Sequence, residues 1–488
     1  MNGAQALLRT LVDSGVDVCF TNPGTSEMHF VAALDDVPEM RGVLTLFEGV
    51  ATGAADGYAR MADKPAAVLL HLGPGLGNGL ANLHNARKGH TGIVNIVGDH
   101  ATYHKKYDAQ LESDIETVAR NVSSWIRRTE SPADVGRDAA EAVAAARRGE
   151  VATLILPADA SWSEGGVPVP AVASRDTPTP AYELSEGAVL LLGGLALREP
   201  YLSAAASTGC RLLAETFPTR LRRGAGIPPV ERLAYLAEFA AMQLEGIKHL
   251  VLCGAKSPVS FFAYPGKASD LVPEGCEVSE CDPRALLDLR GSEPIQGQPP
   301  GRPDRPTGEL TAQTVAAALG ALMPEGAIVS DEANTAGLHA PGATAGAPPH
   351  DWLCLTGGAI GQGLPVAVGA AVACPDRKVI ALEADGSAMY TIQSLWTMAR
   401  EGLDVVTVLY NNRAYDVLNM ELGRVGATGD RAKEMFDLST PALDFVALAN
   451  GMGVPASRAV TADEFTNALE KALHEPGPAL IEAVIPRM

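Results

Sequence analysis

The chain is poor in positive charge, in aromatic residues and in long apolar runs. It carries 38 Lys and Arg against 58 Asp and Glu, a net charge of −20, which argues against nucleic acid or an anionic membrane as a partner. No run of 18 apolar residues occurs, and the N-terminal MNGAQALLRTLVDSGVD lacks the basic and apolar regions of a signal peptide. These absences predict a cytoplasmic protein that neither spans a membrane nor binds one.

Paired cysteines are also missing. The seven cysteines are scattered without a Cys-x-x-Cys pair, and several lie in apolar contexts such as LVLCG, which indicates buried thiols in a reducing compartment. Aromatic residues make up 5% of the chain although 47% of it is hydrophobic, so small and aliphatic residues must supply the cores. This composition is typical of parallel α/β layers, whose buried strands are continuous aliphatic runs.

Two proline-rich segments divide the chain into three parts, because such segments cannot continue helices or central strands. Their prolines are Pro168, Pro170, Pro178 and Pro180 in the first, and Pro294, Pro299, Pro300, Pro303 and Pro306 in the second. We therefore predict domains at 1–165, 181–290 and 307–488. In each, aliphatic strands alternate with helical stretches, so the predicted fold is α/β with three doubly wound parallel sheets.

The predicted strands are short aliphatic runs that often end in Gly, Asp or Asn. They lie within residues 16–24, 42–47, 66–72, 92–99 and 152–158 of the first part, 188–194, 210–216, 249–255 and 276–282 of the second, and 327–332, 351–358, 378–386, 405–412 and 479–486 of the third.

The most specific motif runs from Asp385 to Asn412. Asp385-Gly386-Ser387 follows one predicted strand, and Asn412 ends the next, so a crossover helix brings both to one edge of a parallel sheet. Ligands bind at this edge in open α/β sheets. A carboxylate and an amide oxygen suit Mg²⁺, and the N–H groups of Gly386 and Ser387 at the start of a helix suit a phosphate. The motif predicts magnesium together with a diphosphate.

Two polar residues follow strands of the first domain. Glu48 comes after an apolar strand and opens a Gly- and Ala-rich helix, where it is either a reactive carboxylate or an acid that stabilises the helix start. His71 ends another strand, as a proton shuttle or a structural histidine. His100 and His104 have helical spacing but no third ligand nearby, which disfavours a zinc site.

Other common motifs do not explain the chain. The loop Asn22-Pro23-Gly24-Thr25-Ser26-Glu27 reads as a turn followed by a capping box. No Gly-x-Ser-x-Gly elbow, Walker A lysine motif or His-Glu-x-x-His occurs, and GPGLG at 73–77 lacks the rest of a Rossmann fingerprint.

Taken together, these motifs resemble the thiamine-diphosphate-dependent decarboxylases and carboligases, chiefly benzoylformate decarboxylase and acetolactate-synthase-like proteins. The resemblance spans essentially the whole chain and implies pyrimidine-binding, middle and diphosphate-binding domains in that order. The family's Gly-Asp-Gly motif reads Ala384-Asp385-Gly386 here, with Asn411-Asn412 at the expected distance.

The resemblance also implies roles for individual residues. Mg²⁺ would be held by Asp385, Asn412 and the carbonyl of Ala414. Glu48, within FEGVATGAADGYAR, would hydrogen-bond the aminopyrimidine ring, and Ile360 would hold the cofactor in its bent form. The implied cofactor-binding residues are Glu48, Gly357, Gly358, Ile360, Asp385, Gly386, Ser387, Asn412 and Tyr415.

On the substrate side, His71 aligns with a catalytic histidine of benzoylformate decarboxylase, and Thr25 falls where that enzyme binds the substrate carboxylate with a serine. The decarboxylase's second histidine has no counterpart in the middle domain, where this chain reads SFFAYPGK at 260–267. A carbanion that is poorly protonated would then be free to attack another carbonyl. Tyr415, Val417, Leu418 and Met420 are either apolar pocket residues or ordinary helix packing.

The implied function is thiamine-diphosphate- and Mg²⁺-dependent decarboxylation of a 2-oxo acid, with or without ligation of the acyl carbanion. The alternatives are an acetolactate-synthase-type ligase acting on pyruvate and a non-catalytic paralogue that only binds the cofactor. A short middle domain and the absence of a long C-terminal arm disfavour flavin and a regulatory subunit. The resemblance further implies a homodimer or homotetramer with active sites between subunits.

Overall fold

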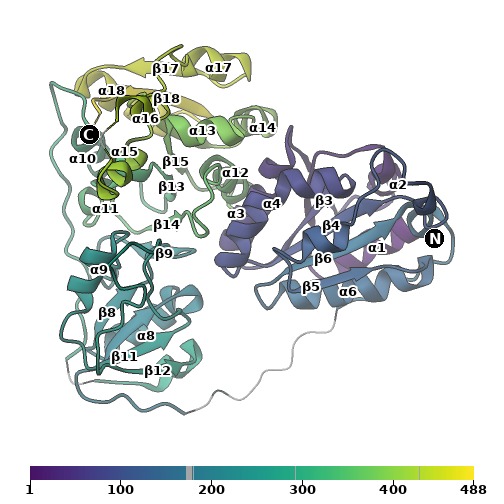
Figure 1. Cartoon of the computed structure of the whole chain (residues 1–488), viewed down its shortest axis with the longest axis horizontal. Coiled ribbons are helices and arrows are strands. Elements are labelled where there is room, and N and C mark those ends of the chain that lie inside the picture. Colours follow the sequence, from purple (N-terminus) through teal and green to yellow (C-terminus); the bar gives the residue numbers. More distant parts are fainter. Residues whose placement is uncertain (172–178, 180, 292, 428, 488) are drawn as a thin grey trace.

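Three β-sheets, each covered by helices, build the molecule (Figure 1). The computed structural model describes residues 1–171, 179, 181–291, 293–427 and 429–487. Pro178 and Pro180 of the first proline-rich segment thus lie outside the described residues. The predicted α/β class with three mainly parallel sheets is confirmed. No helix within the described residues is both long and apolar enough to cross a bilayer.

The first sheet has six parallel strands in the order β2-β1-β3-β4-β6-β5. Its central strands are fully buried aliphatic runs, as expected for a sheet covered on both faces. The strands are β1 (Val18–Thr21), β2 (Arg41–Leu44), β3 (Ala66–Leu70), β4 (Ile93–Asp99), β5 (Trp125–Arg128) and β6 (Val151–Pro157). The helices are α1 (Gly3–Asp13), α2 (Met28–Ala33), α3 (Glu48–Ala62), α4 (Leu72–Lys88), α5 (Ile115–Ala119), α6 (Val135–Ala146) and α7 (Ala158–Trp162).

The middle sheet has five parallel strands in the order β10-β8-β7-β11-β12. They are β7 (Val189–Leu192), β8 (Arg211–Ala214), β10 (Glu231–Arg232), β11 (His249–Cys253) and β12 (Glu277–Cys281), with helices α8 (Tyr201–Ser207) and α9 (Ala237–Leu244).

The third sheet has seven strands in the order β17-β18-β16-β15-β13-β14-β9. One of them, β9 (Leu221–Arg223), comes from the middle part of the chain and pairs antiparallel with β14, whereas the other pairs are parallel. The remaining strands are β13 (Ile328–Glu332), β14 (His350–Cys354), β15 (Val379–Ala384), β16 (Val405–Asn411), β17 (Ala456–Ala459) and β18 (Ala479–Val484). The helices are α10 (Ala312–Leu322), α11 (Ala340–Ala343), α12 (Gly363–Ala373), α13 (Asp385–Thr391), α14 (Ser394–Glu401), α15 (Asp416–Arg424), α16 (Asp430–Glu434), α17 (Phe445–Gly451) and α18 (Ala462–His474).

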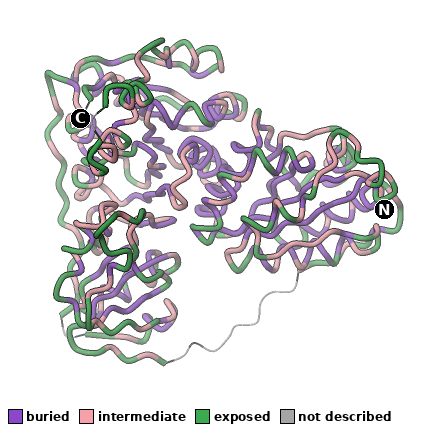
Figure 2. Tube along the Cα trace, viewed as in Figure 1, coloured by how far each residue is buried: buried purple, intermediate pink, exposed green. Residues whose placement is uncertain are grey.

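The first and third domains meet through α3 and α12, which lie side by side between the two sheets in Figure 1. Nearly every residue of both helices is buried, because apolar and small side chains cover them on all sides (Figure 2). The backbones come so close that a Cβ on Gly57 would lie 2.1 Å from the carbonyl oxygen of Val366. A single hydrophobic cluster therefore runs from the first sheet into the third.

The second proline-rich segment packs along the third domain. The N–H of Gly301 donates to the carbonyl of Gly346 at 2.9 Å, and the Arg302 side chain donates to the carbonyl of Ala321 at 2.6 Å. The segment is therefore attached to the third domain at residues 301 and 302.

Candidate active site

His71 and Glu27 form a hydrogen-bonded pair at the edge of the first sheet. His71 follows β3 and precedes α4, and its Nδ1 lies 2.9 Å from Glu27 Oε2. The Ser26 hydroxyl lies 3.1 Å from the same Nδ1. Glu27 is buried and also accepts the Gly24 N–H at 2.9 Å. Glu27 thus fixes the imidazole ring through Nδ1 and leaves Nε2 as the nitrogen that can exchange a proton with a ligand.

Glu48 lies beside this pair. It opens α3, its side chain is buried, and its Oε2 accepts a hydrogen bond from Asn78 Nδ2 at 3.1 Å. A Cβ built on Gly75 would lie 3.4 Å from the His71 Cβ and 3.5 Å from Glu48 Oε1. Glu48 and His71 therefore flank the start of α4, and Gly75 leaves the space between them open. Thr25 is exposed at the neighbouring loop.

Asp385 and Asn412 come together in the third domain as the sequence predicts. Asp385 Oδ2 accepts the N–H of Arg413 at 2.6 Å, and Asn412 Oδ1 accepts the N–H of Ala414 at 3.0 Å. Burial, and to a smaller extent the nearby Asp416, raise the pKa of Asp385 to about 6. A bound cation would lower the cost of this buried carboxylate.

The oxygens that could hold a cation here are of mixed type. The described residues contain no group of three or more His, Cys, Asp and Glu side chains placed for a metal. At Asp385 the available donors are one carboxylate, the Asn412 amide and backbone carbonyls, a set that suits Mg²⁺ and not zinc.

A 70 Å³ cavity lies over Asp385. Gly386 is required at its floor, because a Cβ there would meet the Tyr415 ring at 2.2 Å. The amide of Gly386 donates to Asp385 Oδ1 at 2.8 Å, and the Ser387 hydroxyl donates to Glu383. Ala384, which replaces the first glycine of the family motif, has a φ of −88°, so the backbone does not need glycine there. The cavity is lined by Ala333, Asn334, Thr335, Ala336, Ile360, Ala384, Asp385, Gly386, Ser387, Tyr410, Asn412, Ala414, Tyr415, Asp416 and Val417.

The loop that contains Gly357, Gly358 and Ile360 is attached to the first domain of the same chain. Asn85 Nδ2 donates to the carbonyl of Ala359 at 2.8 Å and Asn82 Nδ2 to that of Gly361 at 3.0 Å. The loop is thus held from one side by α4, while Ile360 lines the cavity over Asp385.

A buried carboxyl group, Glu332, supports this loop, and a second, Glu383, interacts with it electrostatically. Glu332 accepts the N–H of Gly361 at 2.7 Å and also that of Gly363. Burial raises the pKa of Glu332 to about 7, and burial together with Glu332 raises the pKa of Glu383 well above its usual range. Both pKa values move in the direction that favours a shared proton, because two adjacent buried carboxylates repel each other.

An aromatic cluster from the middle domain reaches the other side of the loop. A Cβ on Gly358 would lie 2.6 Å from the Phe261 ring, so this ring packs directly on the Gly358 backbone. Phe217, Tyr235 and Phe262 have ring centroids 4.8–5.9 Å from that of Phe261. The segment SFFAYPGK therefore places an apolar wall at the loop.

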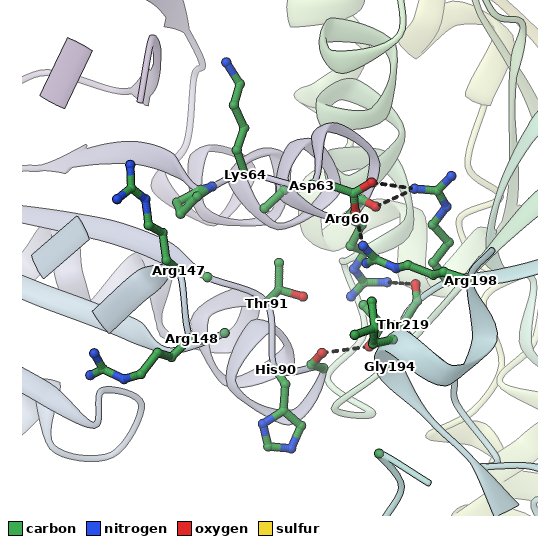
Figure 3. Close-up of a pocket in the computed structure, with 18 of the residues that line it drawn as sticks. Arg60, Asp63, Lys64, His90, Thr91, Arg147, Arg148, Gly194, Arg198 and Thr219 are labelled. Carbon is green, nitrogen blue, oxygen red and sulfur yellow. Dashed lines mark hydrogen bonds and ion pairs between the residues drawn. The ribbon is translucent and has the colours of Figure 1, made fainter. Parts of the chain in front are cut away.

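A cavity of 1210 Å³ lies elsewhere, among residues of all three domains. None of the predicted site residues lines it. Its charges are largely paired: Asp63 binds Arg198, and Arg60 is held by Asp56 and donates to the Thr219 carbonyl at 3.3 Å (Figure 3). Lys64, His90 and Arg148 point in different directions around it (Figure 3). We do not place the chemistry there.

Sequence reasoning missed four residues of the site. Glu27 was assigned only to a capping box, which it does form. Its contact with His71 joins residues that are 44 positions apart in the sequence. Ser26 contacts His71, whereas we singled out its neighbour Thr25. Glu332 and Phe261 carry no local motif, although an acid at the end of an aliphatic strand was a signal for Glu332.

Comparison with known proteins agrees with this arrangement. Residues 1–119 match the profile described as thiamine pyrophosphate enzyme, N-terminal TPP binding domain, and residues 336–483 match the corresponding C-terminal TPP binding domain. The chain is 62% identical, over 100% of both chains, to a Mycobacterium tuberculosis protein named "Putative acetolactate synthase large subunit IlvX". It is 30% identical to benzoylformate decarboxylase of Pseudomonas aeruginosa over 96% of each chain.

A solved structure shares the fold over the full length. The thiamine diphosphate-dependent 4-hydroxybenzoylformate decarboxylase of Rhodococcus jostii superposes with a TM-score of 0.85 at 24% identity, covering 100% of both chains. With the two matched profiles and the relatives above, these similarities cover every part of the chain that carries the candidate site. The chain belongs to the thiamine-pyrophosphate-dependent enzyme family, alongside its decarboxylases and acetolactate-synthase-like members.

Proposed function

We propose that this protein is a thiamine-diphosphate- and Mg²⁺-dependent enzyme that decarboxylates a 2-oxo acid and releases or ligates the acyl unit. The observation that carries the proposal is the cluster of Glu48, His71 and Glu27, which supplies a buried carboxylate and an oriented imidazole at one sheet edge. Family membership alone would not require an intact acid–base cluster.

The third domain has features that fit the diphosphate and its cation. Asp385, Asn412 and the carbonyl of Ala414 would hold Mg²⁺, and Gly386 and Ser387 would lie against the phosphates. The fit rests on the mixed oxygen donors, the buried Asp385 carboxylate, and the Tyr410 hydroxyl, which is buried at the cavity without a hydrogen-bond partner among the described residues. Ile360, Tyr415, Gly357 and Gly358 would complete the set of residues that hold the cofactor.

The bound cofactor supplies the electron sink that decarboxylation of a 2-oxo acid needs. Glu48 would hydrogen-bond the aminopyrimidine ring. His71, held by Glu27, would exchange a proton with the substrate carbonyl oxygen at its free Nε2. Thr25 and Ser26, on the loop beside His71, would bind the substrate carboxylate through their hydroxyl groups.

Phe261 affects whether the acyl unit is protonated or ligated. It packs on Gly358 in the segment where benzoylformate decarboxylase has its second histidine, and a phenyl ring cannot donate a proton. This favours a second candidate, ligation of the acyl unit to another carbonyl compound, as the name of the 62% identical relative also implies. The apolar cluster around Phe261 favours a donor with an apolar side chain.

The Glu48 cluster of one subunit and the Asp385 cavity of another would meet between the subunits of a homodimer or homotetramer. Within one chain no first-domain residue lines the described cavity over Asp385, and in Figure 1 helix α15 lies apart from α3 and α4. A cytoplasmic location would fit the seven cysteines, all of which are free thiols.

The test is a product assay on purified protein with thiamine diphosphate and Mg²⁺. Benzoylformate is scored for aldehyde and pyruvate for acetolactate, which separates decarboxylation from ligation. We expect Glu48→Gln to lower turnover by about 10²-fold or more while calorimetry still detects cofactor binding. Glu39→Gln, an exposed first-domain change, is the matched control. A wild-type protein that binds the cofactor but turns over no 2-oxo acid in a broad panel would instead be a non-catalytic paralogue.

A further inference from the structure

Two half-buried arginines, Arg223 and Arg232, lie on one face of strand β14, and no carboxylate of the described residues pairs with them. Arg223 sits opposite His350 in the β9–β14 pair, and its guanidinium carbon lies 5.0 Å from the centroid of the Trp352 ring. Arg232 Nη1 donates to Cys354 Sγ at 3.3 Å. His350, Trp352 and Cys354 alternate along β14, so both guanidinium groups lie on the same side of the sheet.

The other arginines around this strand are paired with acids. Asp351, on the opposite side of β14, binds Arg220 at 2.9 Å and Arg377 at 2.6 Å, with Arg222 at 3.4 Å. Within the described residues neither Arg223 nor Arg232 has an acidic group within 4.0 Å. The one carboxylate behind them, Asp331, already accepts the Trp352 indole N–H at 3.0 Å. Burial, and then the adjacent Arg232, lower the pKa of Arg223 to about 10, as expected for two cations that face each other.

A 190 Å³ cavity adjoins both guanidinium groups. Arg223 uses one donor on the Pro341 carbonyl and Arg232 one on Cys354, so each keeps further N–H groups of its five for a ligand. The space is well above the roughly 15 Å³ that one water requires. The remaining walls are mostly apolar, with the polar side chains of Arg222 and Gln298 among them. They are formed by Leu221, Arg222, Gly224, Ile227, Pro228, Pro229, Val230, Gln298, Pro341, Ala345 and Trp352.

We propose that this cavity is a binding site for the oxyanion of a small acid, held by Arg223 and Arg232 and separate from the catalytic site. Guanidinium groups bind carboxylates and phosphates through paired N–H donors, and a half-buried cation without a carboxylate partner gains from such a ligand. The apolar walls favour a carboxylate with a short apolar body over free phosphate. The ligand would link the segment 221–232 of the middle part to β14, which leads into the loop of Gly357 to Ile360.

The test uses the holoenzyme with thiamine diphosphate and Mg²⁺, and the probes butanoate, benzoate and inorganic phosphate, each compared with chloride at equal ionic strength. We expect saturable binding by calorimetry and a rise in the unfolding midpoint, strongest with the organic acids. Arg232→Gln should weaken binding by about tenfold or more, whereas Arg290→Gln, an exposed arginine, should leave it unchanged.

A second variant distinguishes the loss of the binding site from misfolding of the protein. Ala345→Met fills the cavity without removing a charge or a residue of the catalytic cluster, so it should abolish binding and keep turnover. Phosphate binding as tightly as the organic acids would identify the ligand as an inorganic oxyanion. The proposal is overturned if no probe binds more tightly than chloride, or if Arg232→Gln and Ala345→Met bind as the wild type does.

Discussion

Glu215 directly follows strand β8 and lines the 1210 Å³ cavity. Burial raises the pKa of Glu215 to about 7, and the nearby Lys256 lowers it by a smaller amount. In the unfolded chain an ordinary glutamate titrates near pH 4.3. The folded protein therefore binds more protons between about pH 4.5 and pH 7, and this residue's contribution to stability falls as the pH rises through that window.

We predict that Glu215→Gln raises the thermal unfolding midpoint above pH 7 by about 2 to 4 °C and has no such benefit near pH 4.5. The measurement is a series of thermal scans from pH 4.5 to 8 on variant and wild type. Glu186→Gln is an exposed change in the same domain. The difference between its unfolding midpoint and that of the wild type should be the same at every pH of the series. A midpoint difference for Glu215→Gln that is the same at every pH would contradict the prediction.

Single residues also mark the limit of what the sequence predicts. The juxtaposition of Asp385 and Asn412 followed from strand order alone, and both residues line one cavity in the structure. The contact of Glu27 with His71 could not be predicted, because it depends on the side-chain geometry of two loops that only the folded sheet brings together. The same holds for Phe261, whose packing on Gly358 joins two domains.

Among the elements, the contact between α3 and α12 has little tolerance for added volume. A Cβ on Gly57 would lie 2.1 Å from the Val366 carbonyl oxygen, and backbone cannot move aside as a side chain can. We predict that Gly57→Ala destabilises the protein by about 1 to 3 kcal/mol or more, although alanine is the better helix former.

Chemical denaturation of Gly57→Ala against wild type measures this effect. Gly451→Ala is the matched control, because a Cβ at this end of α17 meets no atom within 4 Å and φ is not positive there. We expect the control to be neutral or slightly stabilising. Equal stabilities for the two variants would show that the domains separate easily at this contact.

The predicted strands are all present, and the elements that the sequence missed share one property. Strands β5, β9, β10 and β17 are short and rich in charged or polar residues, for example Leu221-Arg222-Arg223 in β9. Such strands are set by their pairing partner and not by their own hydrophobicity. This is why the middle part of the chain was expected to stay within 181–290, whereas β9 joins the third sheet.

For the whole molecule, the central question is which chains supply the two halves of one site. The loop of Gly357 to Ile360 is held by α4 of its own chain. The cavity over Asp385 nevertheless has no described first-domain residue in its wall. A closed twofold dimer would place the Glu48 cluster of one chain over the Asp385 cavity of its partner, and the reverse at the second site.

We predict that two inactive variants restore activity when their chains are mixed. Glu48→Gln and Asp385→Ala each disable both sites of a homodimer, whereas a mixed dimer has one site with both changes and one with neither. With random pairing, half of the dimers are mixed, and each mixed dimer has one intact site of its two. About a quarter of wild-type turnover should therefore return after co-expression. Mixing Glu48→Gln with His71→Ala is the control, because both changes lie in the first domain and every site then carries one. If each site were built from a single chain, the first mixture would be as inactive as the control.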